Sequence, residues 1–151
     1  MPIGTPIVAS RSGIIVRTEG RYVDGDNKVG HENLLIIRHD DGTYSRYWHL
    51  TNDRELVSVG DAVKQMDVIA FSGNTGNSTE PHLHFDVVDE RCDPNFDIKK
   101  ELRACQTYPI TFRNTQALDC GLLYDESYRA LPRLSSGVAG SPEEFRGDSG
   151  R

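Results

Sequence analysis

The segment 82–88 alternates between polar and apolar residues, which predicts a β-strand with two distinct faces. The apolar face, expected to lie against the core, consists of Leu83, Phe85 and Val87. His82 and His84 lie on the opposite face, roughly 6.6 Å apart for a rise of about 3.3 Å per residue. Two imidazoles this close can act on one metal-bound water: one imidazole binds the metal ion, and the other takes a proton from the water. The alternative is that both are half-buried strand histidines.

Other short apolar runs predict further strands and turns. The Asp-Asp-Gly sequence at 40–42 should join two strands into a β-hairpin. His49 lies on the returning strand and shares a face with Ser45 and Tyr47, whereas His39 flanks the turn and is expected to be structural. The predicted strands comprise residues 7–9, 14–17, 34–39, 43–50, 56–64 and 68–71.

The strand pattern weakens after residue 88. Residues 97–104 predict a short helix, and residues 108–113 predict an edge strand, because Pro109 would not fit a central one. Residues 135–151 are rich in Gly, Ser, Pro and Glu and predict a disordered tail. We therefore expect a β domain over residues 1–90, a C-terminal extension packing on it over residues 91–134, and a tail over residues 135–151.

Composition narrows the class of protein. The chain has 151 residues, 36% of them hydrophobic, and 14 glycines, which favours a turn-rich all-β domain. The net charge of −6, without a basic cluster, argues against nucleic acid as a partner. No apolar run approaches a membrane span. No signal peptide is visible, which ordinarily indicates the cytoplasm unless the natural N-terminus lies further upstream.

Three cysteines are present without a C-x-x-C pair, so a structural zinc knuckle is not expected. Cys92 and Cys105 could close a short loop by a disulfide in an oxidising compartment, which would leave Cys120 as a free thiol. Three reduced thiols in a loop-rich tail are the alternative.

Two polar loops lie between the predicted strands. In the loop 19–33, Asp24, Asp26 and His31 could in principle bind a metal, although such residues are more often turn formers and solvated charges. The Gly-rich loop 72–79 is not followed by the Lys-Ser/Thr of a phosphate-binding loop. We interpret it as a tight turn that allows a substrate backbone to approach closely.

Several linked motifs resemble one family in order along the chain. They are Gly4-Thr5-Pro6-Ile7-Val8-Ala9, the Gly13 turn, His39-Asp40-Asp41-Gly42-Thr43, Tyr47-Trp48-His49-Leu50, Val59-Gly60-Asp61-Ala62-Val63, Ile69-Ala70-Phe71-Ser72-Gly73-Asn74-Thr75-Gly76 and Pro81-His82-Leu83-His84-Phe85. Residues 4–88 thereby resemble the lysostaphin-like (LytM-type) zinc metallopeptidases, which cut the peptide bridges of bacterial peptidoglycan. Residues 108–131 also resemble, more loosely, an extension of some bacterial relatives. The resemblance implies an all-β, antiparallel fold of the duplicated hybrid motif type, similar to a barrel-sandwich hybrid.

The resemblance also implies a role for each histidine of the motifs. His84 matches a zinc ligand, His82 matches the base that takes a proton from the zinc-bound water, and His49 matches the histidine that stabilises the oxyanion. Zinc lowers the pKa of its water to about 7, so a neutral imidazole can take that proton at neutral pH. The implied function is zinc-dependent endopeptidase activity on peptidoglycan, in the periplasm or outside the cell.

The sequence departs from the family at its start. Relatives take two further zinc ligands, a histidine and an aspartate, from a motif just before the segment matching Gly4, whereas this sequence begins at Met1. A catalytic zinc requires three protein ligands. We therefore expect an N-terminally truncated enzyme, inactive as it stands. The alternatives are a non-catalytic module that binds cell-wall peptide or activates a partner hydrolase, and a metal site rebuilt from the loop 19–33. Glu80 also departs, because relatives commonly have a small residue there.

A binding module of another class is also conceivable. Residues 59–70 resemble the hairpins of biotinyl and lipoyl carrier domains, which carry a lysine at an exposed tip. Here Lys64 lacks the surrounding methionines or acidic residues of such a tip, and a carrier has no use for a His-x-His strand. The metallopeptidase interpretation is therefore preferred.

Overall fold

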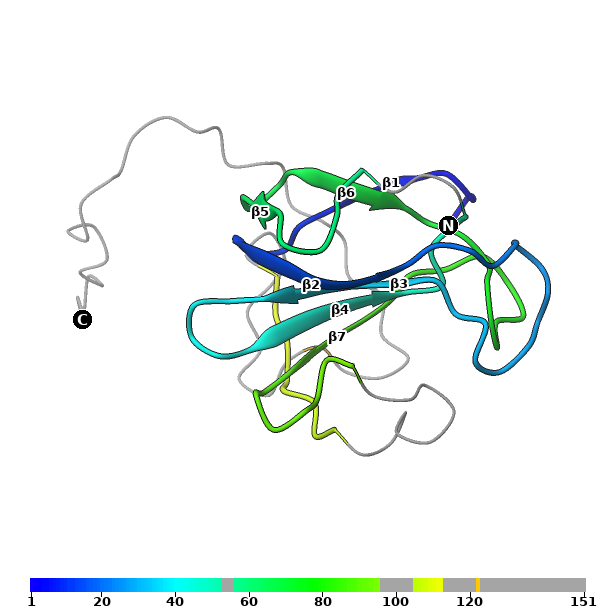
Figure 1. Ribbon diagram of the computed structural model, residues 1–151. Helices are drawn as coiled ribbons and strands as arrows, with labels where there is room; N and C mark the ends of the chain where they lie inside the picture. The colour runs from blue at the N-terminus through cyan, green and yellow to red at the C-terminus, as the bar shows by residue number, and fades with distance from the viewer. Residues whose placement is uncertain (53–55, 96–104, 113–121, 123–151) are drawn as a thin grey trace, which may run out of the picture. The chain divides into compact units, whose positions relative to one another are not determined.

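The computed structural model describes residues 1–52, 56–95, 105–112 and 122, and these ranges contain seven strands and no helix (Figure 1). No described segment could cross a membrane as a helix. The strands are β1 (Pro6–Val8), β2 (Gly13–Glu19), β3 (Leu34–Arg38), β4 (Tyr44–Trp48), β5 (Ala62–Val63), β6 (Val68–Phe71) and β7 (His84–Val88). All of them belong to the first of two compact units, Met1–Ile110 and Thr111–Arg151.

The strands form two antiparallel sheets. β1 pairs with β6, and a five-stranded sheet has the order β5-β2-β3-β4-β7. In this larger sheet β4 lies between β3 and β7, and Trp48 of β4 stands directly opposite His84 of β7. The predicted all-β, antiparallel fold is confirmed, and the register places the end of β4 beside the start of β7 (Figure 1).

The main core lies between the two sheets. Leu35 and Ile37 of β3 join Ile7 of β1 and Ile69 of β6 in one buried cluster. The alternate residues of β3 join Trp48 in a second cluster on the opposite face of the larger sheet. Both faces of β3 are thus covered, which explains why the sequence of this strand is continuously apolar instead of alternating.

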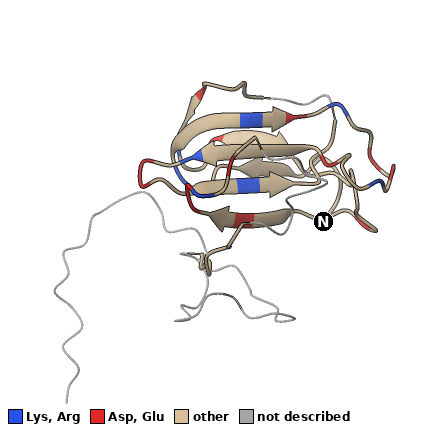
Figure 2. Cartoon of the chain, turned by 60° about the horizontal axis from the view of Figure 1, so that its bottom comes forward, with Lys and Arg blue, Asp and Glu red and all other residues tan. Residues whose placement is uncertain are grey.

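Charged residues of both signs are interspersed along the described part of the chain (Figure 2). They lie mainly in the loops, with single charges on strands, such as Asp86 on β7. Two of these strand charges, Arg46 on β4 and Asp86 on β7, form an ion pair that is discussed below.

Two predicted strands differ from the structure. Of residues 56–64, only Ala62–Val63 form a strand, because Asp61 closes a turn with Ser58 through both its backbone N–H and its carboxylate. The predicted edge strand at 108–113 is wrong for the described residues 108–112. Pro109 has no N–H to donate to a neighbouring strand, so pairing stops at an isolated bridge between Val88 and Thr107.

Several predictions fall on residues that the structure does not describe. These are the helix at 97–104, the thiol of Cys120, the tail at 135–151 and most of the extension over 91–134. The packing of that extension on the β domain therefore stays a prediction.

Candidate functional site

Three histidines from neighbouring strand ends lie together. His49 follows β4, His84 begins β7, and His82 precedes β7 in an isolated bridge with Gly73. The ring centroid of His49 lies 4.7 Å from that of His82 and 6.0 Å from that of His84. On the opposite face, Leu83 and Phe85 pack against the core as predicted. The structure thus brings together the three histidines that the sequence singled out.

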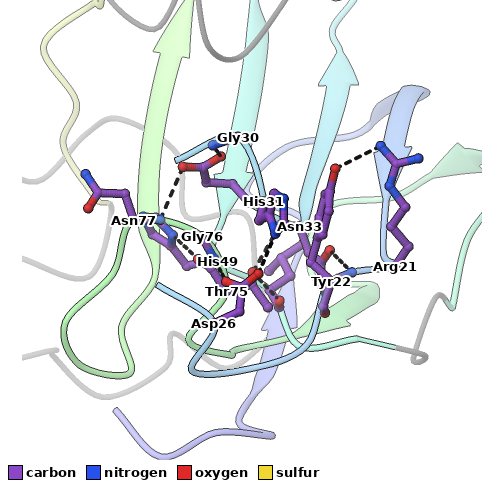
Figure 3. A network of polar contacts seen from close by, with 12 residues as sticks. Arg21, Tyr22, Asp26, Gly30, His31, Asn33, His49, Thr75, Gly76 and Asn77 are labelled. Carbon is purple, nitrogen blue, oxygen red and sulfur yellow. Dashed lines mark hydrogen bonds and ion pairs between the residues drawn. The ribbon is translucent and has the colours of Figure 1, made fainter. Parts of the chain in front are cut away.

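His49 is held in a defined orientation. Its backbone φ of 61° is left-handed, and its side chain is buried. The Nδ1 atom lies 2.7 Å from the carbonyl oxygen of Thr75 (Figure 3). A carbonyl only accepts hydrogen bonds, so Nδ1 carries the proton and Nε2 is the acceptor in the neutral ring. Burial lowers the pKa of His49, aided by charge on His82 and His84 and opposed by the bond to Thr75.

His82 has the same tautomer for a similar reason. Its Nδ1 lies 2.9 Å from the carbonyl oxygen of Glu80 and 3.2 Å from the hydroxyl of Ser78. That hydroxyl also lies 2.7 Å from the amide oxygen of Asn74, to which it donates. Glu80 thus contacts His82 through its main chain. The neutral ring of His82 therefore also has Nε2 as its acceptor.

His84 is the most exposed of the three and lies next to a buried ion pair. Its Nε2 is 3.5 Å from Oδ2 of Asp86, two residues further on the same face of β7. Asp86 in turn accepts two hydrogen bonds, of 2.6 and 2.7 Å, from the guanidinium of Arg46. Burial raises the pKa of Asp86, but the hydrogen bonds from His84 and Arg46 lower it by more.

Asp86 and Arg46 were missed in the sequence, although a signal existed. The period of two that grouped His82 with His84 also places Asp86 on their face. Arg46 stands directly opposite Asp86 in the register of β4 and β7, which the sequence alone does not fix.

The described residues do not complete a site for a metal ion. No group of three or more His, Cys, Asp or Glu side chains in this part of the chain is placed to hold one. In the loop 19–33, Asp24 accepts hydrogen bonds from the backbone of Asn74 and the hydroxyl of Thr51, and Asp26 lies 2.6 Å from Nδ1 of His31. In the structure these side chains hold the loop in place.

Of two further expectations, the structural role of His39 is confirmed, and of the two alternatives left open for the cysteines the structure contains the disulfide. His39 is structural: its Nδ1 lies 2.9 Å from the carbonyl oxygen of Ser12 and its Nε2 3.0 Å from the hydroxyl of Ser45. Cys92 and Cys105 form a disulfide, with their Cα atoms 5.3 Å apart.

Comparison with known proteins places the chain in a family. The model of peptidase family M23 matches residues 1–95. The chain is 38% identical over 88 residues to the peptidoglycan DD-endopeptidase ShyA of Vibrio cholerae, covering 58% of the chain and 18% of ShyA. It is 41% identical over 85 residues to lysostaphin of Staphylococcus simulans, covering 56% of the chain and 16% of lysostaphin.

A solved structure agrees with these sequence matches. The catalytic domain of the antimicrobial peptidase lysostaphin from Staphylococcus simulans has a TM-score of 0.50 at 37% identity, covering 62% of this chain and 65% of that one. The chain spans about a fifth of the length of the curated relatives named above. Since the family model covers more than half of the chain and the fold agrees with a solved member, the chain belongs to peptidase family M23.

Proposed function

We propose that the chain is the catalytic part of a zinc-dependent endopeptidase that cleaves peptide cross-links of peptidoglycan. The observation that carries this proposal is the convergence of His49, His82 and His84 at adjoining strand ends, with ring centroids 4.7 and 6.0 Å apart. The relative named a peptidoglycan DD-endopeptidase supports the substrate class, and lysostaphin, described as an antimicrobial peptidase, supports cleavage of a peptide bond.

The three histidines take different roles in this proposal. His82 is the general base, since its Nδ1 is bonded to a carbonyl and its Nε2 can accept a proton from the attacking water. His49 stabilises the oxyanion. In the neutral ring Nε2 is a hydrogen-bond acceptor, so Nε2 of His49 has to be protonated before it can donate to the oxyanion. The negative charge that develops in the transition state favours this protonation.

His84 is proposed as one zinc ligand. Its neighbour Asp86 fits the pattern in which a carboxylate orients a ligating histidine. Among the described residues, no group of three or more His, Cys, Asp or Glu side chains is placed to hold a metal ion. We propose that the other two, a histidine and an aspartate, come from the motif that in relatives precedes the segment matching Gly4.

The proposed substrate lies outside the cytoplasm, so we propose a periplasmic or extracellular location. The disulfide between Cys92 and Cys105 supports this, because such bonds persist mainly in oxidising compartments.

The test compares the chain of 151 residues with an extended form, which also contains the residues that the gene encodes directly before Met1. The extended form is expected to hold about one zinc per chain by elemental analysis and to release peptides from purified peptidoglycan. His84→Ala should lose both properties, and His82→Ala should keep zinc but lose cleavage. The control His31→Ala should keep both, because His31 contacts Asp26 and not the histidine cluster.

Each other outcome contradicts a stated part of the proposal. Zinc retained in His84→Ala would refute the ligand role. An extended form that binds peptidoglycan but neither holds zinc nor cleaves would favour the alternative of a non-catalytic module that binds cell-wall peptide or activates a partner hydrolase.

A further inference from the structure

Three carboxylates fasten the loop between β2 and β3 to the Gly-rich segment 73–77. We call Asp24, Asp26 and Glu32 the carboxylate brace, because each accepts a hydrogen bond from a different backbone N–H of that segment. The bonds run from Asn74 N to Asp24 Oδ1 (2.5 Å), from Gly76 N to Asp26 Oδ1 (3.2 Å) and from Asn77 N to Glu32 Oε1 (3.3 Å).

The two loops approach so closely that only glycine fits at two positions. A Cβ at Gly73 would lie 2.5 Å from Oδ1 of Asp24 and 2.4 Å from the backbone nitrogen of Thr51. A Cβ at Gly76, which has a φ of 72°, would lie 2.4 Å from Cγ of Glu32. The glycines of this segment thus allow the carboxylates to reach the backbone.

The peptide unit held by the brace is the one that orients His49. Thr75 is fully buried between the braced amides, and its carbonyl oxygen accepts the Nδ1–H of His49 at 2.7 Å. The hydroxyl of Thr75 is fixed as well, because it accepts from the backbone of Asn33 at 3.0 Å and donates to the carbonyl of Leu50 at 2.9 Å. The carbonyl and the hydroxyl of Thr75 are therefore both hydrogen-bonded.

We infer that Asp24, Asp26 and Glu32 are positioning residues for the histidine cluster: by holding the Thr75 carbonyl in place they fix the ring orientation and the Nδ1–H tautomer of His49. A carbonyl that moves away releases Nδ1, and the proton then distributes between both ring nitrogens. The effect on catalysis rests on the proposed function, whereas the effect on the His49 ring does not.

Glu32→Gln is the sharpest test, because the change keeps the size of the side chain. Glu32 is buried, with 3% of its surface exposed, and its two oxygens accept from Gly30 N at 2.8 Å and from Asn77 N. In glutamine one of these oxygens becomes an NH₂ group, which is a donor, so one of the two bonds has to break.

The measurement is the ring ¹⁵N chemical shifts of His49 by NMR in the full chain at neutral pH, where only five histidines need assignment. The unaltered chain should show a protonated Nδ1 and an unprotonated Nε2. In Glu32→Gln the two shifts should move toward each other, as expected for a mixture of tautomers. As a matched control, Asp67→Asn alters a carboxylate that caps the backbone of Lys64 in an exposed turn and should leave His49 unchanged.

A second pair of variants decides the question if Glu32→Gln does not fold. Asp26→Ala removes the bond to Gly76 and the contact with His31, whereas His31→Ala keeps the bond to Gly76 and loses the contact with Asp26 and the stacking on Tyr22. The ring shifts of His49 should therefore change in Asp26→Ala and stay unchanged in His31→Ala. The inference is overturned if the folded Glu32→Gln or Asp26→Ala chain keeps the ring shifts of the unaltered protein.

Peptidoglycan cleavage separates this inference from the proposed function. In the active form, we expect Glu32→Gln to lower kcat by about tenfold with little change in KM, because a small misplacement of a catalytic group affects mainly the chemical step. If the extended form does not cleave peptidoglycan, the proposed function is refuted, and the ring shifts still decide whether the brace orients His49.

Discussion

Replacing Arg46 by methionine should destabilise the fold strongly, because it leaves the carboxylate of Asp86 buried opposite an apolar side chain. The two residues face each other across β4 and β7, and their side chains have exposed fractions of only 4% and 12%. Methionine fills a similar volume without supplying a donor, so the loss measures the ion pair more than a cavity.

The magnitude follows from the two hydrogen bonds, of 2.6 and 2.7 Å, that the guanidinium donates to Asp86. A hydrogen bond to a charged group contributes about 1.5–3 kcal/mol. Removing one partner of a buried pair typically costs about 3–5 kcal/mol, in agreement with two such bonds. For a domain of this size a loss of about 4 kcal/mol lowers Tm by roughly 15 °C or more.

Urea unfolding followed by circular dichroism measures this loss, with Arg11→Met as the matched control. Arg11 also pairs with an aspartate at 2.7 Å, but both side chains are about half exposed, so this variant should lose less than about 1 kcal/mol. The reasoning is refuted if the two variants lose equal stability. Replacing both members of the buried pair, as in Arg46→Met with Asp86→Leu, should recover part of the loss.

The same pair predicts a pH dependence. The folded pKa of Asp86 lies below its ordinary value of 3.8, because hydrogen bonds from His84 and Arg46 outweigh the effect of burial. A group with a lowered folded pKa stabilises the protein above its unfolded pKa, and this stabilisation is lost as the pH falls through the folded value. The urea midpoint should therefore fall more steeply below about pH 4 than it does in Asp86→Asn.

The remaining predictions concern the backbone and the disulfide. Gly76→Ala should cost roughly 2–4 kcal/mol in urea unfolding, because its φ of 72° is combined with a contact of 2.4 Å to a neighbouring side chain. Gly25→Ala, with a φ of 82° but open space around it, should cost only about 1 kcal/mol, and equal losses would count against the steric explanation. Replacing Cys92 and Cys105 by serine should cost about 3 kcal/mol, given their separation of 13 residues, and an unchanged urea midpoint would contradict this.

The two faces of the strand at 82–88 could be predicted because they are encoded locally, whereas a role for His49 was implied by the family resemblance. The period of two at 82–88 gives the two faces of a strand without any knowledge of its partners. The edge strand predicted around Pro109 was wrong because strand formation there depends on a partner outside the segment. Local pattern and tertiary pairing agree for β7 but not for residues 108–112.

The brace could not be predicted for a different reason. Asp24, Asp26 and Glu32 are indistinguishable in the sequence from the solvated acids of any polar loop, and their partners lie 45 to 50 residues away. Their partners are moreover backbone N–H groups, which every residue except proline carries. No side-chain pattern could therefore have indicated which segment they bind.

The left-handed backbone of His49 restricts which residues can replace it over the course of evolution. Outside glycine, this conformation is tolerated best by asparagine, aspartate and histidine, and least by β-branched residues. A lineage that loses catalysis would therefore keep its fold most easily by exchanging His49 for asparagine or glycine, whereas valine or isoleucine would strain the end of β4. In relatives that have lost catalysis, position 49 should consequently hold one of the few residue types that tolerate this backbone conformation, even though selection for catalysis has ended.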